Sequence, residues 1–188
     1  KYRFPRGPIL INNWEATYFD FNEEKILSIA RQASELGIEM LVLDDGWFGS
    51  RDSDDAGLGD WFVNTDKLKG GLADLVRGIN GLGMKFGIWI EPEMVNEDSC
   101  LYREHPDWAL TIPGRKPCRS RNQLVLDMSR SDVRDYIFDS ISAVLKSANV
   151  EYVKWDMNRS ICDIYSAALP KERQGEVYHR YVLGVYDL

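Results

Sequence analysis

The sequence predicts an α/β fold in which parallel strands alternate with helices, about the first four units of a (β/α)8 TIM barrel. Two observations support this fold class. Four short apolar runs are each followed by polar turn residues and then by a segment with helical spacing of its apolar residues. Residues capable of chemistry stand directly after these runs, where barrels build their active sites. A whole barrel needs about 250 residues, so 188 residues are enough for about half of one.

The expected strands are short, continuous apolar runs. Such runs are typical of parallel strands that are buried on both faces. We expect four of them, at residues 8–12, 40–43, 86–90 and 152–155, and one further short strand at residues 124–126.

The expected helices begin and end at residues that favour helix termini. Asn22 is a good N-cap, Ser131 starts a helix with an acidic residue in its first turn, and Gly37 and Gly83 favour helix ends. The helices are therefore expected at residues 22–36, 72–82, 131–145 and 172–186.

An open, doubly wound sheet is the alternative arrangement of such units. That fold concentrates its ligand contacts in one glycine-rich turn. The chain has no G-x-G-x-x-G sequence and no Walker loop, so neither a dinucleotide nor ATP is expected. Because the chemically active residues follow several different strands, we expect the barrel, as a single partial domain over residues 1–188.

The composition excludes several classes of protein. Hydrophobic residues make up 44% of the chain and charged residues 28%, which is typical of a globular domain. The net charge of −7 argues against a nucleic-acid partner, which requires clustered positive charge. No apolar run approaches the roughly 18–20 residues of a membrane span, and the first residues resemble no export signal. The absence of an initiator Met suggests a piece of a longer chain.

Few residues could hold a metal ion. The two histidines, His105 and His179, have no Cys or His neighbour at ligand spacing, so no metal site is expected. Cys100, Cys118 and Cys162 are an odd and sparse set. Such a set is typical of reduced thiols and favours a cytoplasmic location.

The segment 154–159 has the most informative pattern. Alternate side chains on a strand share a face, so Lys154, Asp156 and Asn158 point one way and Trp155 the other. Inside a barrel an ionised Lys and Asp must pair with each other or with a polar ligand, because unpaired buried charges are costly. A structural ion pair would explain these two residues, but not the carboxylates at other strand ends.

Asp44 and Asp45 follow the second expected strand. Adjacent acids repel each other, so they suggest a solvated turn, a metal site or a site for sugar hydroxyls. Trp14 and Trp47 at neighbouring strand ends favour the sugar. Carboxylates accept hydrogen bonds from vicinal hydroxyls, and an indole face covers the C–H face of a pyranose ring.

The third expected strand and the segment after it contribute further candidates. Trp89 and Glu91 share a face, and barrel packing is the simplest role for Trp89. A solvated loop is the simplest interpretation of Glu93. Arg121, ahead of the expected strand at 124–126, could reach a ligand hydroxyl or hold a carboxylate in place.

Five blocks of this sequence resemble the retaining α-galactosidases of glycoside hydrolase family 36, the melibiase group. The blocks run in the family's order from one end of the chain to the other. They are residues 4–8, 12–15, 43–49, 88–94 and 153–159.

The resemblance implies a role for each of the site residues. Asp156 matches the catalytic nucleophile, Lys154 contacts the sugar hydroxyls with Asn158 beside them, and Asp44 and Asp45 bind the galactose hydroxyls. The family uses no metal and no organic cofactor, and its bacterial members are often tetramers, so a homo-oligomer is expected. The same resemblance implies that Trp14, Trp89 and Arg121 line the galactose pocket.

One catalytic carboxylate has no match. A retaining glycosidase needs a nucleophile and an acid/base about 5–5.5 Å apart, and the family's acid/base is an Asp on a later strand. Asp163 directly follows the nucleophile's strand and Asp187 lies in a helical stretch, so both are poor candidates. We expect the acid/base outside this chain, and little or no hydrolysis by residues 1–188 alone.

The expected activity is the hydrolysis of terminal α-D-galactosyl residues from oligosaccharides such as melibiose and raffinose, with retention. Three alternatives stay open. The chain could belong to a galactosyl-transferring enzyme of the raffinose-synthase kind, to an α-N-acetylgalactosaminidase, or to a non-catalytic galactose-binding module. A purely structural scaffold would leave the acids and tryptophans at the strand ends unexplained.

Overall fold

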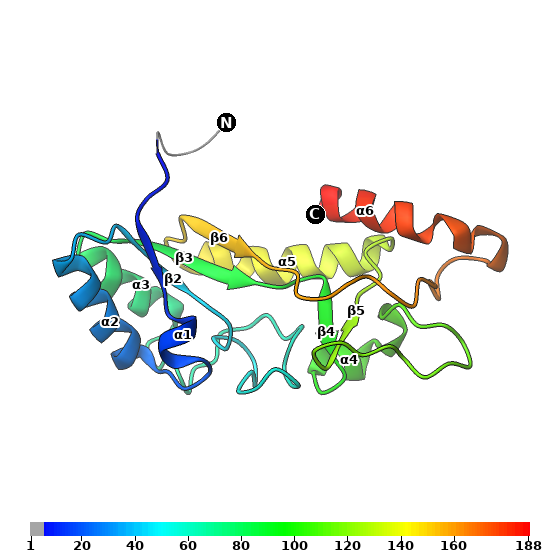
Figure 1. The fold of residues 1–188 in the computed structure, drawn as a ribbon, viewed down its shortest axis with the longest axis horizontal. Helices are drawn as coiled ribbons and strands as arrows, with labels where there is room; N and C mark the ends of the chain where they lie inside the picture. The colour runs from blue at the N-terminus through cyan, green and yellow to red at the C-terminus, as the bar shows by residue number, and fades with distance from the viewer. Residues whose placement is uncertain (1–5) are drawn as a thin grey trace.

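The computed structural model describes residues 6–188, and its main feature is a parallel sheet (Figure 1). The strands lie side by side as β1 (Leu10–Asn12), β2 (Met40–Leu43), β3 (Lys85–Ile90) and β6 (Tyr152–Trp155), with every neighbouring pair parallel. This order follows the chain without reversal, as barrel strands do and as the strands of a doubly wound sheet do not. The prediction of consecutive barrel units is therefore confirmed.

Three helices connect these strands, close to the predicted positions. Asn22 caps the first of them, since its Oδ1 accepts a hydrogen bond from the Lys25 backbone N–H at 2.9 Å. Gly37 and Gly83 end the first two in the left-handed conformation, with φ of 81° and 78°. The helices are α2 (Glu23–Glu35), α3 (Gly71–Gly81) and α5 (Ser131–Ser147).

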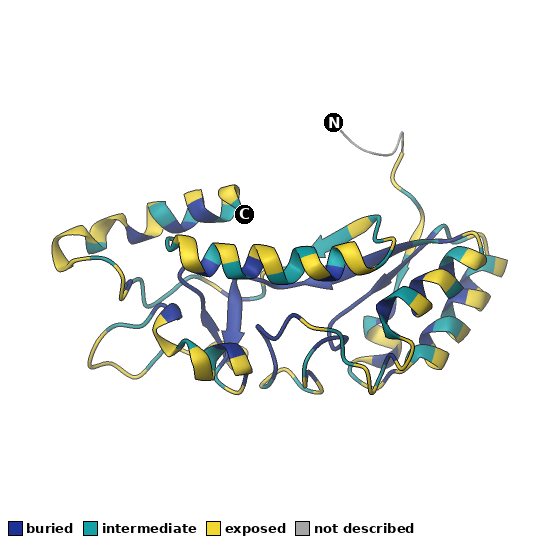
Figure 2. Ribbon diagram, turned by 180° about the vertical axis from the view of Figure 1, so that it is seen from behind, coloured by how far each residue is buried: buried dark blue, intermediate teal, exposed yellow. Residues whose placement is uncertain are grey.

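The outward face of the sheet is buried by these helices. Figure 2 shows the buried strands behind helices whose solvent side is exposed. Removing this apolar surface from water provides the main driving force for the sheet to form. The fully buried side chains on this face include Leu41, Leu43, Phe86, Ile88 and Ile90.

A second cluster of elements extends beyond the carboxyl ends of β2 and β3 (Figure 1). The predicted strand at 124–126 is β5 (Gln123–Val125), and it pairs antiparallel with β4 (Met94–Asn96), which was not predicted. Both carboxylate oxygens of Asp60 accept hydrogen bonds from the first turn of α4 (Cys100–Glu104). A 3-10 helix follows at Pro106–Trp108.

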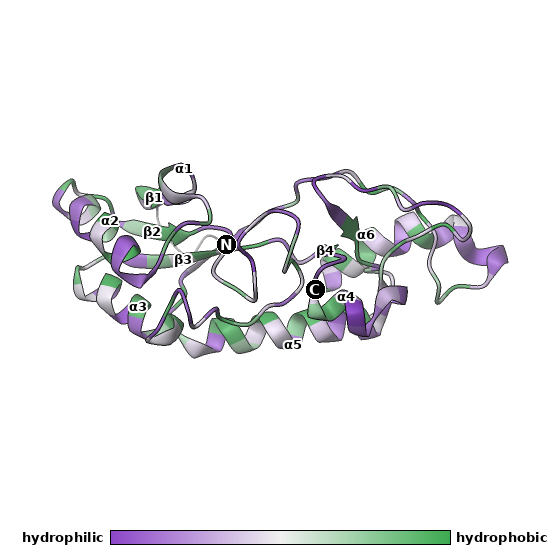
Figure 3. Ribbon diagram, turned by 90° about the horizontal axis from the view of Figure 1, so that it is seen from below, coloured by the Kyte–Doolittle hydropathy of each residue, from purple (hydrophilic) through white to green (hydrophobic). Residues whose placement is uncertain are grey.

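The chain ends in a helix that packs on this second cluster. The predicted helix over 172–186 begins as a 3-10 helix, Lys171–Glu176, and becomes α-helical only in α6 (Val177–Asp187). The Gln174 side chain donates to the backbone oxygens of Ser166 and Leu169, so this turn is held against the preceding loop. Figure 3 shows α5 running along the molecule beneath the sheet and on toward α6.

Two remaining features bear on the sequence predictions. A short helix, α1 (Trp14–Thr17), directly follows β1 and was not predicted. The motif block at 4–8 lies partly outside the described residues. Between residues 6 and 188, no helix combines the length and the apolar character needed to cross a membrane.

Gly184 allows α6 to contact the backbone before α5, because a Cβ at this position would overlap the Met128 carbonyl oxygen. We expect Gly184→Ala to lower the free energy of unfolding by about 1–3 kcal/mol, as overpacking does. Urea denaturation measures this. Gly175→Ala is the matched control, because a Cβ on Gly175 would have no atom within 4 Å. Equal stability of the two variants would contradict this account of the contact.

Candidate active site

The inner face of the sheet is built in levels that the strand register defines. Gly87 pairs with Tyr152, and a Cβ on Gly87 would lie 2.9 Å from the Tyr152 ring. The ring therefore occupies the space beside Gly87. A pocket of about 290 Å³ opens on this face around the same level, lined by Leu10, Asn12, Val42, Tyr152 and Lys154.

Three of the predicted site residues share the next level, toward the carboxyl ends of the strands. Trp89 pairs directly with Lys154, and Asp44 follows the last residue of β2. Because Val42 pairs with Gly87, and alternate residues share a face, Asp44 and Trp89 lie at the same height. The register thus brings together residues that are far apart in the sequence.

Asp44 is the partner of Lys154. The Lys154 Nζ lies 2.8 Å from Asp44 Oδ2, and the same oxygen accepts a hydrogen bond from the Asn12 side chain. Asp44 is buried, whereas Lys154 is partly exposed. The sequence left an ion pair between Lys154 and Asp156 open as an alternative; the structure pairs Lys154 with Asp44, across the sheet, instead. Among the residues that the structure describes, no cation forms an ion pair with Asp156.

Asp156 directly follows β6, and three donors hold its carboxylate. Oδ2 accepts from Trp89 Nε1 at 3.0 Å and from Asn158 Nδ2 at 2.9 Å, and Oδ1 accepts from the Met157 backbone N–H at 3.1 Å. Burial acts to raise the pKa of Asp156, but the hydrogen bonds from Trp89 and Asn158, together with the charge of Lys154, lower it below its usual value. The group is therefore an oriented, ionised carboxylate.

Asp45 is held by a cation of its own, Arg51. The guanidinium donates to both carboxylate oxygens, with Nη2 at 2.8 Å from Oδ2 and Nε at 3.0 Å from Oδ1. Arg51 is also bound to the Asn96 side chain at 2.9 Å, which ties the pair to β4. Burial, which leaves Asp45 only 6% exposed, raises the pKa of its carboxyl despite the Arg51 contacts.

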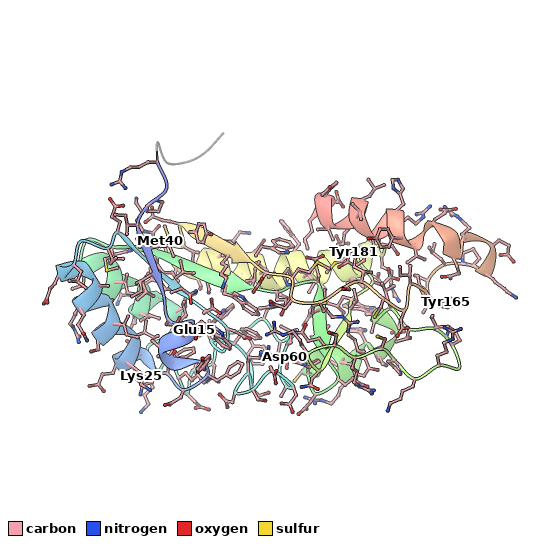
Figure 4. All side chains as sticks on the ribbon, in the orientation of Figure 1. Glu15, Lys25, Met40, Asp60, Tyr165 and Tyr181 are labelled. Carbon is pink, nitrogen blue, oxygen red and sulfur yellow. The ribbon has the colours of Figure 1, made fainter. Side chains whose placement is uncertain are left out.

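Two further carboxylates follow β3, and both are buried. Glu91 accepts hydrogen bonds from the Asn158 backbone N–H at 2.6 Å and from the Gln123 side chain at 3.1 Å. Glu93 accepts from Trp155 Nε1 at 3.0 Å and from the hydroxyl of Tyr181, which is labelled in Figure 4, at 2.7 Å. Glu93 is thus no solvated loop residue, as the sequence had suggested, but ties α6 to the end of β6.

The sequence and the fold can now be compared with known proteins. The Melibiase family model matches residues 1–188, the whole chain. The chain belongs to the melibiase family. Among its relatives, α-galactosidase AgaA of Geobacillus stearothermophilus is 63% identical over 98% of this chain and 25% of its own length. α-Galactosidase 1 of Pediococcus pentosaceus is 59% identical over 100% of the chain and 26% of its own length.

Solved structures of family members have the same fold. The crystal structure of the glycoside hydrolase family 36 α-galactosidase AgaA from G. stearothermophilus superposes with a TM-score of 0.95 at 63% identity. The superposed region covers 97% of this chain and 26% of the AgaA chain. An AgaA variant in complex with stachyose gives the same TM-score at 62% identity and the same coverage. The chain spans about a quarter of the length of these melibiase relatives.

The tryptophans of this melibiase chain fall into two groups. Trp47 is 1% exposed and donates through Nε1 to the Trp89 backbone oxygen, so it belongs to the core. The interpretation of Trp47 as a sugar platform is therefore wrong. Trp89 is equally buried, but its Nε1 reaches Asp156. Trp14, in α1, is partly exposed and makes edge contacts with Tyr18 and Phe19.

Arg121 lies in a tight turn at the start of β5. Both Arg121 and Asn122 have left-handed backbones, with φ of 52° and 59°, and both are exposed. Among the hydrogen bonds and ion pairs of the described residues, none joins the Arg121 side chain to the Asp44 and Asp156 cluster. The assignment of Arg121 to the galactose pocket stays a prediction.

Sequence reasoning missed Arg51 and Gln123, and it gave Glu91 no role. For Arg51 a signal existed, because a buried Asp45 needs a cation or several donors and Arg51 is the first basic residue after it. The Asp44 and Asp45 pair was also considered as a metal site. Lys154 and Arg51 supply the positive charge there instead. The described residues contain no group of three metal-ligating side chains.

Arg51 is expected to be essential for stability. Arg51→Ala would leave the buried Asp45 without its cation and should lower the free energy of unfolding by about 3–5 kcal/mol. Denaturant unfolding checks this. Arg77→Ala is the control, because it breaks an exposed pair with Asp74 and should cost less than about 1 kcal/mol. Similar losses in the two variants would refute the buried-pair account.

Proposed function

We propose that the protein containing this chain is a retaining α-galactosidase that hydrolyses terminal α-D-galactosyl residues from oligosaccharides such as melibiose and raffinose. The observation that carries the proposal is the oriented, ionised Asp156 beside the Asp44–Lys154 pair. Relatives over the whole length of the chain are named α-galactosidases. A solved AgaA variant is in complex with raffinose.

Asp156 is the nucleophile in this proposal. Its carboxylate attacks the anomeric carbon, the bond to the leaving oxygen breaks, and an acid/base carboxylate protonates that oxygen. The same acid/base then removes a proton from water, which displaces Asp156 and releases galactose with net retention. The lowered pKa of Asp156 keeps the attacking group ionised. Trp89 and Asn158 orient it through Oδ2, and Oδ1 accepts from the Met157 backbone N–H.

The acid/base is proposed to lie outside residues 1–188. Glu91 has a raised pKa, mainly through burial, which is a property expected of a general acid. Its geometry does not suit that role, because the residue is 1% exposed and both oxygens accept hydrogen bonds from the protein. Hydrolysis by residues 1–188 alone is accordingly not expected.

The sugar hydroxyls are proposed to bind to the level of Asp44 and Lys154. The Lys154 ammonium carries three donors, one of which is used by Asp44. Asp45 is proposed to accept from the hydroxyls beside it while Arg51 holds its orientation. The part-exposed ring of Trp14 supplies an apolar face for the sugar, and Arg121 is proposed to close the pocket from the β5 side.

The location and assembly of the protein are further proposals. The three cysteines are free thiols, which supports a reducing, cytoplasmic environment. Association into a homo-oligomer is supported by exposed apolar side chains on α6, among them Tyr178, Leu183 and Tyr186.

Asp156→Asn in the full-length protein is expected to abolish nearly all turnover while galactose still binds. The amide keeps the size of the carboxylate but cannot form the glycosyl-enzyme. Release of galactose from raffinose and galactose binding by calorimetry measure the two effects. Asp139→Asn, on the exposed face of α5, is the control. Near-normal turnover of Asp156→Asn would overturn the nucleophile assignment.

Product analysis also separates the related activities. Galactosylated acceptors in place of free galactose would indicate a transferase of the raffinose-synthase kind. Preference for an N-acetylgalactosaminide would indicate an α-N-acetylgalactosaminidase. Galactose binding without a covalent adduct from a mechanism-based galactoside would indicate a binding module.

Trp89→Phe is expected to move the acidic limb of the kcat/KM profile to higher pH. Loss of the indole N–H removes a donor to the charged form of Asp156, so the pKa of Asp156 rises. As the pH is lowered, Asp156 is therefore protonated at a higher pH in the variant than in the wild type, and activity is lost there. Trp108→Phe is the control, because the Trp108 ring packs against His105 and Tyr136 and not against Asp156. An unchanged acidic limb in Trp89→Phe would show that this hydrogen bond has no influence on the nucleophile.

A further inference from the structure

Glu91 is a buried carboxylate whose contacts join three separate segments. It directly follows β3, and its Oε1 accepts the Asn158 backbone N–H at 2.6 Å. Its Oε2 accepts from Gln123 Nε2, on β5, at 3.1 Å. The carboxylate therefore holds the turn after β6 against the ends of β3 and β5.

The turn that Glu91 holds carries a donor to the proposed nucleophile. Asn158 gives its backbone N–H to Glu91 and its side-chain Nδ2 to Asp156 Oδ2, at 2.9 Å. One residue is thus bound at two points, with its backbone on one carboxylate and its amide on the other. Displacement of the Asn158 backbone would move the amide away from Asp156.

We propose that Glu91 is a positioning residue for the nucleophile: it holds the backbone of Asn158 where the Asn158 amide can orient Asp156. The inference rests on the proposed function, in which Asp156 attacks the sugar. Glu91 itself touches no reacting atom, because it is 1% exposed and acts through Asn158. The strand order places Glu91 and Asp156 at the ends of the neighbouring strands β3 and β6.

The charges around Asp156 come from three elements. Lys154 lies two residues before Asp156 on β6, and its ammonium is bound to Asp44, which follows β2. Glu91 lies near Asp156 at the end of β3. Burial raises the pKa of Glu91, and repulsion from Asp156 adds to this in spite of its hydrogen bonds. Glu91 thus has two separable effects, its reach to Asn158 and its negative charge near Asp156.

Two substitutions in the full-length protein separate these effects. Glu91→Asp keeps the charge but withdraws the carboxylate by one methylene from Asn158. Glu91→Gln keeps the reach and removes the charge. The amide can be accommodated because Gln123 Oε1 is buried without a hydrogen-bond partner among the described residues, and a rotation of the Gln123 amide would present that oxygen to the new N–H group.

Glu91→Asp is expected to lower kcat about 100-fold, the effect of a misplacement near 1 Å, with little change in KM. Its acidic limb should move to higher pH, since Asp156 loses a donor. Glu91→Gln is expected to keep kcat close to wild type and to leave the acidic limb nearly in place, because the pKa of Glu91 is raised and that of Asp156 lowered, so Glu91 is already uncharged where Asp156 titrates. An unchanged kcat and acidic limb in Glu91→Asp would overturn the proposal.

The matched control is Glu93→Asp. Glu93 is a buried carboxylate on the same segment, and its two donors, Trp155 and Tyr181, are not hydrogen-bonded to Asp156. This variant should lose stability without moving the acidic limb. An equal shift of the limb in Glu93→Asp and Glu91→Asp would mean that Glu91 has a general structural role, which would also overturn the proposal.

A double substitution tests whether Glu91 acts through Asn158. In an Asn158→Ala background, Glu91→Asp should lower kcat no further, because residues that act as a unit are not additive. If Glu91→Asp lowered kcat in the Asn158→Ala background as much as it does in the wild type, the positioning role of Glu91 would be overturned. The proposed function would still hold in that case, provided that Asp156→Asn is inactive. If Asp156→Asn kept turnover, the proposed function itself would fail. Should Glu91→Asp not fold, a loss of kcat of about 100-fold in Glu91→Gln, which keeps the acceptor for the Asn158 N–H, decides against the proposal.

Discussion

The fold depends on one constraint, which is that carboxylates at the ends of buried parallel strands must each find donors inside the protein. Asp44, Asp45, Glu91 and Glu93 are almost completely removed from water, and an unpaired charge in such a place costs several kcal/mol. Each of the four therefore has its own partners, supplied by a different segment. Arg51 comes from the loop after β2. Asp45, Glu91 and Glu93 consequently link the sheet to the second cluster, whereas Asp44 links strands within the sheet.

The main elements could be predicted because their signals are local. The apolar run at 40–43 and the glycine at 37 specify a strand and a helix end without reference to the rest of the chain. The grouping of Asp44, Lys154 and Asp156 was also predictable, because parallel strands bring their carboxyl ends to one edge. Strand alternation further gave the correct face for Trp89.

What the sequence did not reveal depends on contacts between distant segments. β4 is only three residues long, and it is defined by its pairing with β5, about thirty residues away. Trp47 and Trp14 both stand at strand ends, yet only the fold shows that Trp47 packs against Phe48 and Trp61. The choice of Asp44 as the partner of Lys154 depends on the register between strands that are not adjacent in the chain.

The neighbours Gly87 and Tyr152 carry a consequence for how this family can diverge. The Tyr152 ring occupies the volume that a side chain at position 87 would need. A residue larger than glycine at 87 therefore requires the ring at 152 to shift or to be replaced by a smaller side chain. Homologues with an aliphatic residue at 87 should therefore carry a small residue at 152, and the two columns should covary although 65 residues separate them in the chain.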